Sequence, residues 1–107
     1  MLRIHDVAIE LVREVAPVAK AIERHDGDLA RQLRRALSSV PLNIAEGSDQ
    51  RGARRASHYS IALGSAREAW SAMLTAEAWG YVPAPEPALA QRFRHVIGAL
   101  HLNLRAR

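Results

Sequence analysis

Arginine is the residue whose number and spacing offer chemistry in this chain. Fourteen of its fifteen basic residues are arginine, and the formal net charge at pH 7 is +4. A guanidinium donates hydrogen bonds in a planar fork that matches phosphate oxygens. Six arginines within one stretch of the chain therefore predict a single basic patch for RNA or DNA: Arg31, Arg34, Arg35, Arg51, Arg54 and Arg55.

Two other interpretations of these arginines stay open at the level of sequence. They could form an ordinary solvated surface, in which arginines pair with Glu46 and Asp49. The preference for arginine over lysine could also reflect the codon usage of a GC-rich genome. Charge alone does not separate these interpretations from a phosphate-binding patch.

The sequence contains no pattern of catalytic or metal-binding residues. None of the five histidines lies four residues from another, and no Glu-x-x-His occurs, so a helical metal site lacks its ligand spacing. Glu10 and Glu14 are four residues apart but belong to the polar side of their predicted helix. The segment Gly47–Gly52 lacks the Lys-Ser/Thr that completes a phosphate loop. We expect no catalytic residue, no metal and no cofactor.

Composition restricts the class of protein. The 107 residues fit one domain, 1–107, and a hydrophobic share of 49% is enough for a core. The absence of cysteine excludes disulfides and thiolate metal sites. Charges within the first ten residues and the shortness of every uncharged run argue against a signal peptide and a membrane span. We expect a cytoplasmic protein without membrane contact.

Four helices are the elements that must position these residues. Apolar residues recur at three- and four-residue steps within 4–24, 29–46, 53–79 and 87–104, which is the spacing of one helical face. Asp6 and Asp28 are the predicted N-caps of the first two helices. Gly47 and Gly80 are the residues predicted to end the second and third helices. Pro87 suits the first turn of the last helix.

The predicted fold is all-α. Four helices with short connectors pack most simply as an antiparallel up-down-up-down bundle. Pro17 and Pro41 each remove a backbone donor inside a helix, and because the apolar stripes continue past them we predict bends and not breaks. The predicted inward residues are Ile4, Ala8, Leu11, Val15, Val18 and Ile22; Leu29, Leu33, Leu37, Val40 and Ile44; Ala56, Tyr59, Leu63, Ala66, Trp70 and Met73; and Leu89, Phe93, Val96 or Ile97, Leu100 and Leu104.

Some apolar residues lie off these inward stripes. On the first helix Ile9, Val12 and Ala16 lie well round from the core face, and on the last helix Leu102 lies opposite it. Because a monomeric bundle needs one apolar stripe per helix, we predict that these four residues form the interface of a homo-oligomer. Harmless scattered exposure is the alternative.

Several motifs resemble a known protein family. They are Gln32–Ala36, Ser39–Gly47 with its Pro-x-Asn-Ile-Ala-Glu-Gly string, Tyr59, Ile61-Ala62, Gly64-Ser65, Glu68 and Gly80-Tyr81-Val82. Together they resemble the signature of a bacterial four-helix-bundle family found in intervening sequences of 23S ribosomal RNA genes. The N-terminus departs from the family pattern, because Ile4-His5-Asp6 stands where members often place a tryptophan.

The resemblance has implications for assembly and partners. It implies a cytosolic four-helix bundle that assembles as a homopentamer. The accessory protein of diversity-generating retroelements is similar, and it forms a basic pentameric barrel that binds nucleic acid and a reverse transcriptase. The resemblance therefore implies self-association, and RNA, DNA or a reverse transcriptase as partners.

The residues of the family motif also have a physical interpretation. Pro41 leaves the carbonyl near Leu37 without its helical donor. The amide of Asn43 could repair that gap or cap a neighbouring helix. Glu46 could pair with Arg34 or Arg35, or lie at the start of the next helix. These roles are structural, and with Gly47 they complete the motif.

The sequence therefore predicts a non-enzymatic, homo-oligomeric module. It would bind nucleic acid, or serve as an accessory to an enzyme that acts on nucleic acid, through its arginine-rich surface. The alternative is a protein-interaction scaffold without a role in nucleic-acid binding. Salt dependence distinguishes the two, because phosphate binding weakens steeply as salt rises and an apolar protein interface does not.

Overall fold

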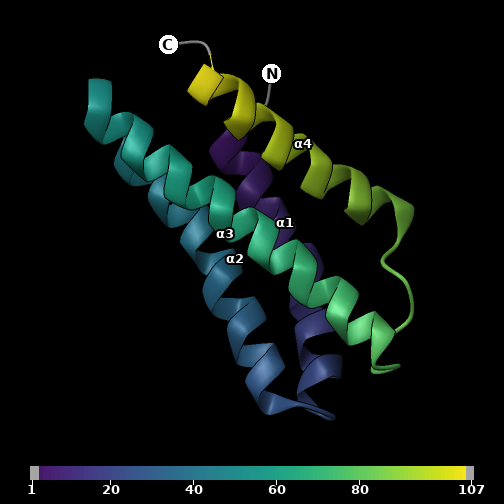
Figure 1. The fold of residues 1–107 in the computed structure, drawn as a ribbon. Coiled ribbons are helices and arrows are strands. Elements are labelled where there is room, and N and C mark those ends of the chain that lie inside the picture. Colours follow the sequence, from purple (N-terminus) through teal and green to yellow (C-terminus); the bar gives the residue numbers. More distant parts are fainter. Residues whose placement is uncertain (1–2, 106–107) are drawn as a thin grey trace.

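The computed structural model describes residues 3–105 of the chain. It contains α1 (Ile4–Glu23), α2 (Gly27–Ser48), α3 (Gly52–Ala78) and α4 (Pro87–Arg105). Within that range there is no strand (Figure 1), which confirms the all-α class. None of the described helices is both long enough and apolar enough to span a membrane.

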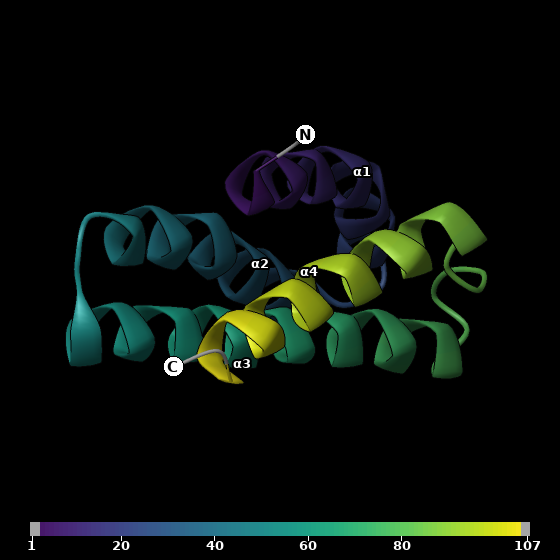
Figure 2. The same cartoon turned by 90° about the horizontal axis from the view of Figure 1, so that it is seen from above.

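The four helices pack as a bundle. Each helix contacts the next one in sequence, and α1 also contacts α4. The α1–α2 turn and the α3–α4 loop lie at one end, and the α2–α3 junction lies at the other (Figure 1). Seen from above, α2 and α3 lie side by side, and their junction extends past α1 and α4 (Figure 2). Both α1 and α2 continue through their prolines, whereas the predicted antiparallel order and the bends at Pro17 and Pro41 stay predictions.

The four predicted stripes supply the core. Most of the predicted inward residues are buried, and the others lie at its edge. On α3 a second row of small residues is also buried, which lets neighbouring helices approach closely. The fully buried large side chains come from all four helices: Val7, Leu11, Val15 and Ile22; Leu33, Val40 and Ile44; Met73; and Phe93, Val96 and Leu100.

The first two helices begin earlier than the sequence predicted. Because α1 begins at Ile4, Asp6 lies in its first turn and is not the N-cap. The N-cap of α2 is Asp26, whose carboxylate accepts a hydrogen bond of 3.0 Å from the backbone N–H of Leu29. Asp28 lies inside the first turn of α2, where its charge still favours the helix N-terminus. Both aspartates near the turn suit an N-cap, so residue type alone did not identify the correct one.

The end of α3 and the start of α4 agree with the prediction. Gly80 has a φ of 80°, which a residue with a side chain rarely adopts. Its N–H donates to the Glu77 carbonyl at 2.8 Å, and the N–H of Tyr81 donates to the Ala76 carbonyl at 3.0 Å. These two hydrogen bonds form a Schellman motif that satisfies the last carbonyls of α3. Pro87 is the first residue of α4, as predicted.

Aromatic rings attach the α3–α4 loop to the α1–α2 turn. The rings of Tyr81 and His25 stack with centroids 5.1 Å apart, and the Tyr81 hydroxyl donates to Asp26 at 3.4 Å. The ring of Trp79 also stacks on Tyr81, with centroids 6.2 Å apart. Desolvation and the nearby Asp26 carboxylate raise the pKa of the Tyr81 phenol. This end of the bundle is therefore held by contacts between segments that are distant in sequence.

Gly47 does not end α2, which corrects the prediction that it follows the helix. The helix continues to Ser48, and within residues 3–105 the glycines with positive φ are Gly52 and Gly80. Gly47 is buried, and a Cβ added to it would lie 2.7 Å from the Cδ1 and Cε1 atoms of Tyr59. A glycine near the end of an apolar stripe suits a helix terminus and a close helix contact equally well, so the sequence did not distinguish them.

The contact between Gly47 and Tyr59 yields a stability prediction. We expect Gly47→Ala to lower the free energy of unfolding by about 1–3 kcal/mol, because the added methyl group must displace a buried ring. The matched control is Gly64→Ala, since no atom lies within 4 Å of a Cβ at Gly64. Alanine at this exposed site in α3 should stabilise the helix by up to about 1 kcal/mol. Urea denaturation followed by circular dichroism measures both, and equal effects would contradict the close contact.

Candidate nucleic-acid interface

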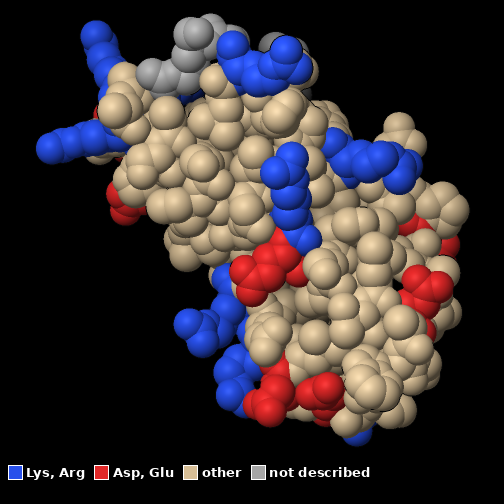
Figure 3. Space-filling model, in the orientation of Figure 1, with Lys and Arg blue, Asp and Glu red and all other residues tan. Residues whose placement is uncertain are grey.

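The structure divides the six predicted arginines into two groups instead of one patch. Arg31, Arg34 and Arg35 lie in the first half of α2 and are called the α2 arginines. Arg51, Arg54 and Arg55 lie at the α2–α3 junction and are called the tip arginines. The helix between Arg35 and Ser48 separates the groups by roughly 20 Å at about 1.5 Å per residue. Figure 3 shows basic side chains projecting at both levels of one face, with uncharged surface and carboxylates between them.

Carboxylates neutralise most of the charge of the α2 arginines. Arg31 Nη2 lies 2.6 Å from Asp28 Oδ1 in the preceding helical turn. Arg34 Nη1 lies 2.6 Å from Glu23 Oε1, and this ion pair joins α2 to α1. Arg35 is exposed and forms no ion pair with any residue in 3–105. The α2 arginines therefore present one unpaired guanidinium.

The tip arginines keep their charge uncompensated. Among the residues that the structure describes, none of Arg51, Arg54 and Arg55 forms an ion pair with a carboxylate. The guanidinium of Arg55 lies over the ring of Tyr59, 4.9 Å from its centroid, in a cation–π contact that fixes its position. The first turn of α3 contains no acidic residue, so the positive end of the helix dipole adds to the same field.

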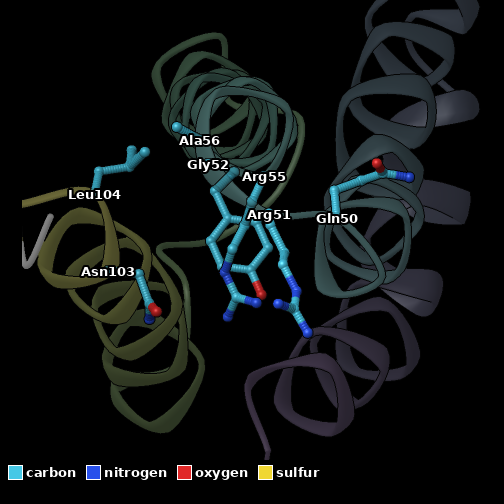
Figure 4. A pocket seen from close by; sticks show the side chains of 8 residues that line it. Gln50, Arg51, Gly52, Arg55, Ala56, Asn103 and Leu104 are labelled. Carbon is cyan, nitrogen blue, oxygen red and sulfur yellow. The ribbon is translucent and has the colours of Figure 1, made fainter.

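A shallow hollow lies beside the tip arginines, between the start of α3 and the end of α4. In Figure 4 the side chains of Arg51 and Arg55 extend in the same direction, and Asn103 faces the hollow from α4. Its volume is about 380 Å³. Asn103 Nδ2 donates to the Ala99 carbonyl of its own helix, so the two guanidinium groups are the main donors beside this open hollow, and they are suited to phosphate oxygens. The lining residues are Gln50, Arg51, Gly52, Arg55, Ala56, Tyr59, Asn103 and Leu104.

Asn43 of the family motif connects α2 to α3. Its Nδ2 donates to the carbonyl and the hydroxyl of Ser39, at 2.9 and 3.0 Å. Its Oδ1 lies 3.1 Å from Nδ1 of His58 on α3. Because the amide nitrogen faces Ser39, the oxygen faces the imidazole, and His58 Nδ1 carries the hydrogen. The expectation that Asn43 repairs a gap near Leu37 is wrong, because the amide reaches the Ser39 carbonyl instead.

Glu46 and Ser65 complete a row of polar contacts between α2 and α3. Glu46 Oε2 lies 3.8 Å from His58 Nε2, and Ser65 Oγ donates to Ser39 Oγ at 2.8 Å. The predicted pair between Glu46 and Arg34 or Arg35 does not form, because Arg34 pairs with Glu23 and Arg35 lies three helical turns away. The motif therefore supplies contacts between α2 and α3. No spacing pattern in the sequence identifies His58 or Ser65 as the partners of its residues.

The predicted oligomer residues differ in how much surface they offer. Ile9 and Val12 are half-buried, and Val12 packs against the core of its own chain. Ala16 is exposed, and Leu102 is 66% exposed. An interface between copies stays a prediction. Of the four predicted residues, Leu102 and Ala16 are the exposed ones that a second copy could contact. The sequence-based reasoning missed four other exposed apolar side chains: Leu42, Ile61, Leu74 and Trp79.

The carboxylates Glu10 and Glu14 do not face each other as metal ligands would. Glu10 pairs with Arg13 on the same helix. Glu14 is half-buried and forms an ion pair with Nε of Arg92, which joins α1 to α4. Glu14 is thus less solvated than its position on the polar face suggested. Within residues 3–105, no group of three His, Cys, Asp or Glu side chains is arranged to hold a metal ion.

The fold and this surface define a small four-helix bundle with an uncompensated basic tip. A family model described as 23S rRNA-intervening sequence protein matches residues 1–98, so the chain belongs to this family. This confirms the resemblance carried by the Pro-x-Asn-Ile-Ala-Glu-Gly string. No curated protein and no solved structure matches the chain. The likeness to the accessory protein of diversity-generating retroelements stays a prediction.

Proposed function

We propose that this chain is a non-enzymatic, homo-oligomeric module of the cytoplasm that binds nucleic acid. Its partner is RNA or DNA, bound directly, or an enzyme such as a reverse transcriptase that acts on nucleic acid. The observation that carries the proposal is that none of the three tip arginines has a carboxylate partner among residues 3–105. They lie at the α2–α3 junction, which extends past α1 and α4 (Figure 2), and the open hollow beside Arg51 and Arg55 leaves them accessible.

The tip arginines would act on the phosphate backbone. Each guanidinium can donate two hydrogen bonds to one phosphate and release condensed counterions. Tyr59 is 4% exposed, so it holds Arg55 and is not available to stack on a base. Binding through phosphates without base contacts predicts little dependence on nucleotide sequence. The α2 arginines contribute less, because Asp28 and Glu23 already neutralise two of them.

Self-association would strengthen weak contacts at each tip. A ring of identical chains repeats the tip arginines around an axis, and linked weak sites gain affinity through effective concentration. Leu102, at 66% exposed, supports an interface on α4. The stoichiometry of five rests on the family resemblance, since no feature of the chain itself determines the number of subunits.

A protein-interaction scaffold without a role in nucleic-acid binding is the second candidate. The observation that favours it is the set of large apolar side chains exposed on a small domain: Leu42, Ile61, Leu74, Trp79 and Leu102. Large apolar side chains at a surface contribute to protein contacts, where burial removes them from water. The arginines would then serve solubility alone.

Charge reversal at the tip tests the nucleic-acid proposal. We expect Arg51→Glu with Arg54→Glu to weaken binding of a short RNA or duplex DNA by about tenfold or more, because two phosphate contacts become repulsive. The control, Arg31→Glu with Arg34→Glu, makes the same change in net charge among arginines that are already paired. Fluorescence anisotropy at low salt measures both. Equal losses, or no loss at the tip with the fold intact, would reject the tip as the site.

The mass of the protein in solution tests the oligomer. We expect light scattering at micromolar concentration to give a multiple of 11.8 kDa, with five chains per ring. Leu102→Asp should reduce this mass without loss of helical content, because an aspartate in an apolar interface must be desolvated. Leu74→Asp, at an exposed leucine on α3, is the control and should leave the mass unchanged. A wild-type mass of 11.8 kDa would exclude the oligomer.

A further inference from the structure

The outward side of α2 carries a regular stripe of residues that stays exposed in the described part of the chain. The residues follow one another at three- and four-residue steps, so they lie on one helical face. All five are exposed, and Leu42 at the centre is 65% exposed. We call this row the α2 outer stripe: Arg35, Ser38, Leu42, Ala45 and Asp49.

The two ends of the α2 outer stripe carry opposite, unpaired charges. Arg35 and Asp49 each lie seven residues from Leu42, which is two helical turns or about 10.5 Å. Neither forms an ion pair with any residue in the described part of the chain. The stripe is therefore positive at one end, apolar in the middle and negative at the other end, with Leu42 at its midpoint.

We propose that the α2 outer stripe binds the same stripe of a second copy of this chain, around a two-fold axis at Leu42. In this antiparallel pairing the two Leu42 side chains meet at the centre. Arg35 of each copy then lies opposite Asp49 of the other, so one contact satisfies four charges. A parallel pairing would place Arg35 against Arg35, which is repulsive. A two-fold interface is self-complementary by definition, and this stripe has the required symmetry of charge.

The shape of the surface around Leu42 agrees with this pairing. Ser38 and Ala45 precede and follow Leu42 on the stripe, and their small side chains allow a second helix to approach. A shallow, open hollow of about 430 Å³ lies next to Leu42, so no side chain of the same chain blocks the approach there. The hollow is lined by Arg34, Arg35, Ser38, Ser39, Leu42 and Asn43.

A second exposed apolar residue borders the same surface on α3. Ile61 is 48% exposed and shares a helical face with His58 and Ser65, which lie three residues before it and four after it. Those two residues contact Asn43 and Ser39 on α2. Ile61 therefore lies on α3 beside the polar contacts to α2, and Leu42 lies on α2 next to Ser39 and Asn43, which make those contacts.

This surface is separate from the one proposed on α4, and it is independent of nucleic-acid binding. It joins two chains, or two rings if the chains form rings through Leu102. In this pairing Arg35 binds Asp49 of the second copy and not a phosphate, and the tip arginines stay available for nucleic acid. Loss of the α2 contact should therefore halve the mass of the particle, whereas failure of nucleic-acid binding would leave that mass unchanged.

Charge exchange tests the pairing directly. We expect Arg35→Asp alone and Asp49→Arg alone each to weaken the association by about tenfold, because each substitution creates repulsion at two symmetric places. The double variant Arg35→Asp with Asp49→Arg re-forms both pairs with the charges exchanged, and it should restore the association. Sedimentation velocity over a concentration series measures the three variants against the wild type. Single variants without effect, or a double variant that does not recover, would overturn the proposal.

Crosslinking provides a second test that does not depend on charge. The chain contains no cysteine, so Leu42→Cys introduces a single thiol. Because the two-fold axis passes near this position, mild oxidation or a short thiol crosslinker should link two copies. Leu74→Cys, an exposed leucine on α3, is the control and should not crosslink at the same protein concentration. Equal crosslinking of the two variants, or none at Leu42→Cys, would overturn the two-fold contact.

Discussion

The close approach of α2 to α3 at Gly47 is the constraint on which the proposed site depends. Because Gly47 has no side chain, the ring of Tyr59 lies directly against α2. The Tyr59 hydroxyl then lies 3.1 Å from Ser48 Oγ, and its ring supports the guanidinium of Arg55. The absence of a Cβ at Gly47 on α2 thus affects where the guanidinium of Arg55 on α3 is held. The family motif, which ends at Gly47, acts on the tip through this contact.

The surface of α2 divides into regions with different tasks. Val40 and Ile44 face the core, and Ser39 and Asn43 make the polar contacts to α3. The side away from these contacts carries Leu42 and remains open. Ion pairs then decide which charges stay available, because Glu23 and Asp28 neutralise two of the α2 arginines. Unpaired charge remains at the tip and along the outward side of α2, and the two proposals use these two places.

Sequence periodicity predicted the helices and their core faces because both depend on local spacing. Residue type predicted that Gly80 ends α3 and that Pro87 begins α4, because the backbone preferences of glycine and proline are local properties. The roles of Gly47 and Asn43 were not predictable, because they depend on how far α3 is shifted along α2. The same holds for the arginines: whether Arg34 is paired depends on Glu23 of another helix. Periodicity identifies which face is buried but not which residues of two helices lie opposite each other.

The central claim is that uncompensated arginines at the tip bind phosphates. The salt dependence of binding tests it most directly, because each phosphate contact that displaces a counterion adds about 0.7 to the slope of log K against log salt for a single strand. For the wild-type chain and a single-stranded RNA, three tip arginines predict a slope near −2 for each tip engaged. A binding constant that barely changes between low and physiological salt would contradict the account and favour an apolar protein interface.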